Sequence, residues 1–216
     1  MNDYIFKIKT ETLHLLPERA VYWPRTQTLF IADPHFGKTA TFRAHAIPLP
    51  EGDMAGDLTR LSQALQRTAA KQLIVLGDLL HAARGRDETV LNTFMTWRAQ
   101  HMDLRIFLVR GNHDRSAGDP PEDWGIQIVN GPTPGPYFVL SHEPLEPETG
   151  YALAGHIHPA VQLTGKGRQS LKLPCFWFGA HCGVLPAFAD FTGGALIKPQ
   201  VGDQIFVLTE TQVMPV

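Results

Sequence analysis

The chain has 216 residues, of which 44% are hydrophobic and 19% charged, and its formal net charge is −2. This composition is typical of a globular protein, and the length fits one domain, residues 1–216, with a substantial core. The weak negative charge excludes a broad basic surface for nucleic acid, so any such contact would depend on local residues or on bound metals.

The N-terminal segment and the cysteine content indicate a cytoplasmic protein. The first eleven residues, MNDYIFKIKTE, carry charges where a signal peptide has an apolar core, and no apolar stretch is long enough to span a bilayer. Two cysteines, Cys175 and Cys182, do not form a disulfide framework, so we expect reduced thiols. No membrane contact is expected.

The predicted elements alternate strand and helix and then become strand-rich. In chain order we expect strands at 4–9 and 20–23 as an opening pair, a strand at 28–32, a helix at 52–70, a strand at 72–76, a helix at 87–101 and a strand at 104–109. The first helix is predicted by Met54, Leu58, Leu61 and Leu65, which recur on one face. Further strands are expected at 126–129, 137–140, 151–154, 170–178, 195–198 and 204–208. This order predicts an α/β fold with βαβ units.

Five short polar sites follow apolar segments, in places where buried strands should end. They are Asp33-Pro34-His35, Gly77-Asp78, Gly111-Asn112-His113-Asp114, His142, and Gly155-His156-Ile157-His158. Short apolar runs that end in polar residues are typical of buried strands with functional residues at their tips. We therefore expect one site, assembled from the ends of a sheet.

The residue types in this set are metal ligands and proton carriers. Asp33 and His35 are two apart, and on an extended segment their side chains would point the same way, as would those of His156 and His158. Asp78 could bridge two cations with its two oxygens. Nitrogen and oxygen donors without thiolate suit manganese, iron or zinc better than calcium. Two metals about 3.5–4 Å apart would lower the pKa of a bridging water, and the resulting hydroxide would be the nucleophile.

The ordered set resembles the calcineurin-like metallophosphoesterase superfamily, whose pattern is D-x-H, G-D, G-N-H-D/E, H and G-H-x-H. The resemblance implies a four-layer αββα sandwich of the metallophosphoesterase type. It assigns Asp33, His35, Asp78 and His158 to one metal, and Asp78, Asn112, His142 and His156 to the other. It also implies that His113 faces the phosphate as a catalytic residue, with Asp114 holding its ring in the cationic form.

His81 stands three residues after Asp78, in the segment GDLLH. The segment resembles a GDLFH-like motif of repair nucleases in the superfamily, whereas protein phosphatases carry GD-x-x-D-R-G. A second histidine near the phosphate would suit a diester, because its alkoxide leaving group needs a proton. The alternative is a histidine that begins a loop.

Residues 15–52 are similar to a small bacterial family, the ligase-associated metallophosphoesterases described as DNA damage response endonucleases. The shared features are LLPERA-x-x-W, D-x-H-x-G-K-x-x-x-F-R, I-P-x-P, GHIHP and a late LPAF-x-x-x-TGG, and Ala46 departs from the glycine expected there. The resemblance implies a manganese-dependent phosphodiesterase that acts as a single-strand DNA endonuclease in DNA repair. It also implies association with a DNA helicase/exonuclease and an ATP-dependent DNA ligase.

Lys38, Arg43 and Arg115 lie just after the site strands and could hold phosphate groups. Their alternative role is that of solvated loop charges.

Two other function classes also stay open at this point: a phosphodiesterase for small-molecule or cyclic nucleotide esters, and a non-catalytic scaffold for repair partners. The intact ligand set argues against the scaffold, because buried, unpaired polar groups are costly without a metal. The oligomeric state is open, with a homodimer as one alternative.

Overall fold

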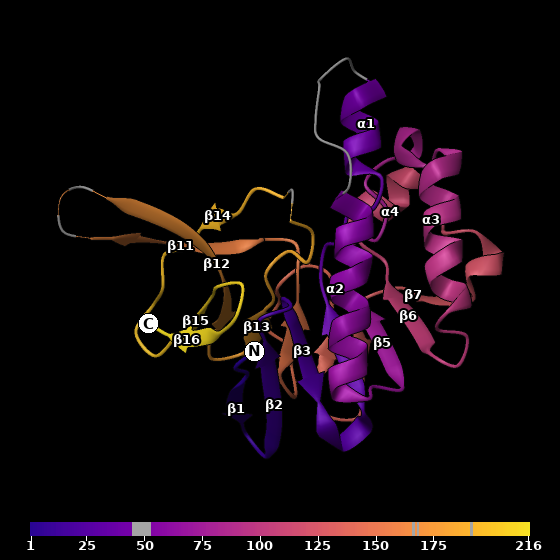
Figure 1. The fold of residues 1–216 in the computed structure, drawn as a ribbon. Coiled ribbons are helices and arrows are strands. Elements are labelled where there is room, and N and C mark those ends of the chain that lie inside the picture. Colours follow the sequence, from indigo (N-terminus) through magenta and orange to yellow (C-terminus); the bar gives the residue numbers. More distant parts are fainter. Residues whose placement is uncertain (45–52, 166, 168, 191) are drawn as a thin grey trace.

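The computed structural model describes residues 1–44, 53–165, 167, 169–190 and 192–216, with two mixed β-sheets as its framework (Figure 1). The first sheet contains β1 (Tyr4–Ile8), β2 (Glu11–Leu16), β3 (Ala20–Trp23), β4 (Thr28–Ile31), β5 (Gln72–Val75), β6 (Arg105–Val109) and β7 (Ile126–Val129) in that spatial order. The second contains β8 (Thr133–Pro134), β9 (Val139–Leu140), β10 (Ala152–Ala154), β11 (Pro159–Thr164), β12 (Ser170–Phe178), β13 (Cys182–Val184), β14 (Ala195–Leu196), β15 (Gln204–Leu208) and β16 (Val213–Pro215).

The helices are α1 (Lys38–Ala44), α2 (Asp53–Thr68), α3 (Glu88–Ala99) and α4 (Asn112–Ala117), with short 3-10 turns at Pro24–Thr26, Ala83–Gly85 and Glu122–Trp124. The helices α1 to α3 connect β4, β5 and β6, which pair in parallel as the predicted βαβ units require, and α4 follows β6. Because parallel strands end at the same edge of a sheet, the residues after these three strands are brought together. Within the described residues, none of the helices has both the length and the apolar character to cross a membrane.

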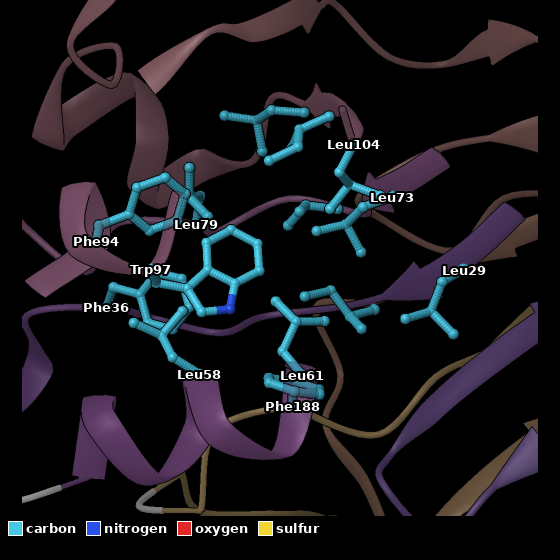
Figure 2. Close-up of a cluster of buried hydrophobic side chains, with 14 of the residues drawn as sticks. Leu29, Phe36, Leu58, Leu61, Leu73, Leu79, Phe94, Trp97, Leu104 and Phe188 are labelled. Atoms are coloured by element: carbon cyan, nitrogen blue, oxygen red, sulfur yellow. The ribbon is translucent and has the colours of Figure 1, made fainter. Parts of the chain in front are cut away.

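The helices α2 and α3 pack their apolar faces on the first sheet. Leu58, Leu61 and Leu65 of α2 are buried, as their spacing predicted. Figure 2 shows this cluster, in which α2 contributes Leu58 and Leu61, α3 contributes Phe94 and Trp97, and the sheet contributes Leu29 and Leu73. The helix α3 begins at a good N-cap, since the side chain of Asp87 accepts a hydrogen bond from Val90 N at 2.8 Å.

A second apolar cluster lies between the two sheets. Phe30 and Ile74 of the first sheet pack in it with Leu153, Phe176 and Phe206 of the second. Alternating side chains of the first sheet therefore face the helices or the second sheet, and both faces are apolar. This packing holds the ends of β9 and β10 near those of β4 and β5, so both sheets contribute to one edge.

Two expectations need correction. The opening strands do not pair with each other, because β2 lies between β1 and β3 and pairs with both. The expected α/β fold with two packed sheets is confirmed, and α2 and α3 cover the first sheet. The predicted strands and helices also omitted α1, α4, β2, β8, β11, β13 and β16, most of which are too short for a clear periodicity.

Candidate metal centre

Five of the polar residues predicted as ligands have left-handed backbone conformations. They are Asp33, His35, Asp78, His156 and His158, with φ between 46° and 68°. Such a conformation costs a residue other than glycine about 1–3 kcal/mol and is concentrated at functional sites. The expectation that Asp33-x-His35 and His156-x-His158 lie on extended segments is therefore wrong. Their side chains converge through turns that follow β4 and β10.

The first ligand cluster consists of Asp33, His35 and His158, whose donor atoms lie within 4.8 Å of one another. The Nε2 atoms of His35 and His158 are 3.3 Å apart, and His158 Nε2 is 3.6 Å from Asp33 Oδ2. His158 Nδ1 donates to the carbonyl oxygen of Gly193 at 3.2 Å, which leaves Nε2 as the nitrogen free to bind a cation.

The second ligand cluster consists of Asp78, Asn112, His142 and His156. His142 Nε2 lies 2.8 Å from Asn112 Oδ1, 3.0 Å from His156 Nδ1 and 3.5 Å from Asp78 Oδ1. His142 Nδ1 donates to the carbonyl oxygen of Leu76 at 3.1 Å. As at His158, a backbone carbonyl fixes the tautomer and directs Nε2 into the cluster.

Asp78 lies between the two clusters and presents one oxygen to each. Oδ2 is 3.9 Å from His35 Nε2, whereas Oδ1 is 3.5 Å from His142 Nε2 and accepts a hydrogen bond from His113 N at 2.9 Å. The carboxylate is 2% exposed, and burial raises the pKa of Asp78 even though His142 lies nearby. A carboxylate in this position could bridge two cations.

The residues present fit two divalent cations. Within the described residues, the buried Oδ1 of Asp33 has no hydrogen-bond partner. The buried Nδ1 of His35 likewise has no hydrogen-bond partner among these residues, and its Nε2 faces His158 Nε2 at 3.3 Å, two ring nitrogens that a cation could share. Burial, with His158 and His113 nearby, lowers the pKa of His35 to about 2, which keeps its ring neutral for ligation. All seven predicted ligands are thus brought together, with the nitrogen and oxygen donors that suit manganese, iron or zinc.

Two glycines let the ligands approach the backbone closely. A Cβ atom on Gly77 would lie 2.0 Å from His142 Nδ1, and one on Gly155 would lie 2.6 Å from Asp33 Oδ2. Gly77 also has a φ of 85°, in the region that favours glycine. The glycines of the G-D and G-H-x-H motifs therefore make room for ligands of the other motifs.

His113 and His81 form a stacked pair beside the first cluster. Their ring centroids are 5.0 Å apart with an interplanar angle of 19°, and His35 meets the ring of His113 edge-on at 5.0 Å. His113 Nδ1 donates to the carbonyl oxygen of His81 at 2.7 Å, so Nε2 is the nitrogen that can exchange a proton with a ligand. Burial, with His113 and Lys38 nearby, lowers the pKa of His81 to about 4.

The predicted contact between Asp114 and the ring of His113 is wrong. The buried carboxylate of Asp114 instead accepts hydrogen bonds from three backbone amides: Asp78 N at 2.8 Å, Gly111 N at 2.9 Å and Leu80 N at 3.2 Å. Burial raises the pKa of Asp114 against the lowering effect of these amides. Asp114 therefore joins the turn after β5 to the start of α4, which fixes Asp78 relative to Asn112.

The three predicted phosphate contacts differ in their surroundings. Lys38 begins α1 beside His35 and His81, and partial burial lowers its pKa. Arg115 is exposed on α4. The side chain of Arg43 lies outside the described part of the structure, as do Ala46 and the I-P-x-P segment.

Sequence reasoning missed several contributors to the site. The carbonyl oxygens of Leu76 and Gly193 orient His142 and His158, and the sequence carries no signal for a backbone acceptor. Phe42 of α1 stacks on His81 at 6.2 Å between ring centroids, and its place in the F-R pair of the first motif was the available signal. Cys175 and Cys182 are free, as expected.

Comparisons with known proteins agree with this geometry. The family model described as calcineurin-like phosphoesterase matches residues 26–171. Among solved structures, the nuclease MPE of Pseudomonas putida is 38% identical, with 100% of both chains covered and a TM-score of 0.87. Yfce, a phosphoesterase from E. coli, is 14% identical, with 84% of this chain and 87% of that chain covered and a TM-score of 0.38. A search of curated proteins found no match.

Proposed function

Because the chain belongs to the calcineurin-like phosphoesterase family, we propose that it is a two-metal phosphodiesterase that cuts single-stranded DNA internally. The observation that carries this proposal is the position of Asp78, whose two oxygens point to two separate ligand clusters. The full-length similarity to a protein described as a nuclease supports nucleic acid as the substrate.

Asp33, His35, Asp78 and His158 would hold one metal, and Asp78, Asn112, His142 and His156 the other. When bound, two cations would lower the pKa of a water between them and neutralise charge on the phosphate, and we propose manganese as the preferred metal. The chain's own contribution is to fix these donors: backbone carbonyls set the tautomers of His142 and His158, and buried turns hold Asp33 and Asp78.

His113 is our candidate for the general acid. Its Nδ1 proton is engaged by the carbonyl oxygen of His81, so a proton on Nε2 would be the one given to the leaving oxygen. His81 stacks on His113 and would limit the movement of that ring, in addition to facing the phosphate itself. Lys38, beside the first cluster, and Arg115, beside the second, would contact phosphate oxygens of the strand.

A single strand suits this site better than a duplex. In-line attack requires one phosphate to reach both metals, and a flexible strand adopts that geometry more readily than stacked duplex DNA. A chain of net charge −2 also lacks a broad basic surface to offset the deformation of a duplex. The repair role and the association with a helicase/exonuclease and a ligase are parts of the proposal supported by the ligase-associated motifs, and the free thiols of Cys175 and Cys182 support the proposed cytoplasmic setting.

A circular single-stranded DNA tests the proposal, since it offers no end to an exonuclease. With manganese we expect linearisation followed by fragmentation, and we expect Asp78→Ala to abolish both. A circle that stays intact while the same sample hydrolyses a cyclic nucleotide or a chromogenic diester would contradict the endonuclease and favour a small-molecule phosphodiesterase.

A further inference from the structure

A hollow of about 230 Å³ opens beside the metal centre on the side of the second ligand cluster. It is lined by His142 itself and by the neighbouring Ser141 and Glu143, with Arg110, Arg115 and Pro132 on its other walls. Because it shares a wall with a proposed ligand, a group bound in this hollow would adjoin any phosphate at the metals.

The two arginines of this hollow differ in their availability. Arg110 is committed to a bidentate ion pair with Asp119, at 2.6 and 2.7 Å, and to Asn130 Oδ1 at 2.9 Å. The exposed guanidinium of Arg115, by contrast, makes no hydrogen bond or ion pair with any residue that the structure describes. Arg115 follows Asn112 by three positions on α4, so both side chains lie on neighbouring parts of the helix surface.

A second cation, Lys38, lies beside the first ligand cluster. Lys38 lines a small hollow with His35, a member of the first ligand cluster. Within the described residues, the half-buried ammonium of Lys38 has no hydrogen-bond partner. Lys38 thus lies beside the first cluster and Arg115 beside the second, and Asp78 presents one oxygen to each cluster.

We propose that the DNA strand crosses the centre from the first cluster, beside Lys38, to the second cluster, and that Arg115 holds the phosphate of the nucleotide next to the cleaved bond in the hollow beside His142. The assignment rests on the proposed nuclease function and adds a contact that a small diester cannot make. Arg115 would thus help to select a polymer over a small ester.

Glu143 sets a limit on the strength of this contact. Its carboxylate is exposed on the wall of the same hollow and would repel a bound phosphate. The hollow therefore holds one free positive and one negative side chain, and the contribution of Arg115 should be that of an exposed charge contact rather than a buried one. Removal of the Glu143 charge should strengthen DNA binding.

The test compares Arg115→Ala with Arg105→Ala, and each variant loses one positive charge. Arg105 lies at the start of β6, whereas the ligand Asn112 follows the other end of this strand. For Arg115→Ala we expect KM for a single-stranded oligonucleotide to rise about three- to fivefold. We also expect the slope of log KM against log salt to fall by about 0.7, as for the loss of one phosphate contact on a single strand. Arg115→Lys should restore most of the slope, Glu143→Gln should lower KM, and Arg105→Ala should match the parent.

Hydrolysis of bis(4-nitrophenyl) phosphate provides the internal reference. Arg115→Ala should lose at least threefold more kcat/KM on DNA than on this diester. Equal losses on both substrates, or a salt slope equal to that of Arg105→Ala, would overturn the assignment while leaving the nuclease intact. A parent enzyme that hydrolyses the diester but leaves DNA uncut would instead remove the proposed function and this inference together.

Discussion

The two ligand clusters differ in how deeply the fold encloses them. In the first, Asp33 is 0% and His35 is 4% exposed, and both residues sit in turns packed between the sheets. In the second, His142 is equally buried, but His156 and Asn112 are exposed. The fold thus fixes one half of the centre from within and opens the other half to solvent and substrate. We expect the first half to hold its metal more firmly.

Asp78 is common to both halves, and its replacement should have the largest effect. Asp78→Asn removes one charged ligand from each cluster, so kcat for a diester should fall at least about a thousandfold. Burial raises the pKa of Asp78 because it disfavours the charged carboxylate. Replacement by a neutral amide should therefore not lower the thermal stability of the metal-free protein. Steady-state kinetics and a melting curve in EDTA measure the two effects. Near-normal activity with full folding would contradict the bridging role.

His113 lies beside the enclosed half without belonging to either cluster. His113→Ala should lower kcat by about 10²–10⁴, the range expected for the loss of a general acid. The metal content should stay at two per chain, as measured by elemental analysis. A variant that loses activity and metal in parallel would show that His113 acts as a ligand and not as an acid.

Asn112 belongs to the open half alone, so its replacement should change the metal affinity of that half without changing the affinity of the other. Asn112→Ala should weaken the binding of one manganese equivalent by about 10- to 100-fold and leave the other unchanged. Manganese titration by calorimetry, with Asp33→Asn as the counterpart on the enclosed side, measures both affinities. Equal weakening of both equivalents would remove the distinction between the clusters.

The replacement of His81 tests whether a side chain beside the enclosed half contributes to diester cleavage. His81→Ala removes the ring that stacks on His113 but keeps the carbonyl that accepts from His113 Nδ1. We therefore expect a smaller loss than for His113→Ala, and a larger loss on a diester than on a monoester. Equal rates for the variant and the parent on 4-nitrophenyl diesters would make His81 a loop residue only.

Gly155 tests how tightly the enclosed half is packed. Its added Cβ would meet Asp33 Oδ2 at 2.6 Å and Ala32 Cβ at 2.7 Å, so Gly155→Ala should lower the free energy of unfolding by about 1–3 kcal/mol. Gly56→Ala is the matched control, because nothing lies within 4 Å of its Cβ and alanine favours the helix α2. Urea unfolding should therefore shift in opposite directions for the two variants.

The sequence predicted the parallel strands of the first sheet and the helices α2 and α3 well, because their signals are local. Apolar runs before Asp33, Asp78 and Asn112 marked three parallel strands, and the spacing of Leu58, Leu61 and Leu65 marked the helix between two of them. The second sheet was harder to predict. The strand β13, which was not predicted, has three residues, and its partner β10 is distant in the chain.

The membership of the site was predictable from residue types, but its geometry was not. Positive φ at Asp33, His35, Asp78, His156 and His158 follows from the way the turns pack, and such strain has no sequence signature outside glycine. The same holds for Asp114, whose three backbone partners come from residues 78, 80 and 111. Its adjacency in sequence to His113 suggested the wrong partner.

The most direct test of the account is anomalous scattering from crystals grown with manganese, combined with elemental analysis of the same protein. We predict two manganese ions per chain, one coordinated by Asp33, His35 and His158 and the other by Asn112, His142 and His156, with one oxygen of Asp78 on each. A single ion that does not touch Asp78, or no metal between Asp33 and His158, would contradict the central claim.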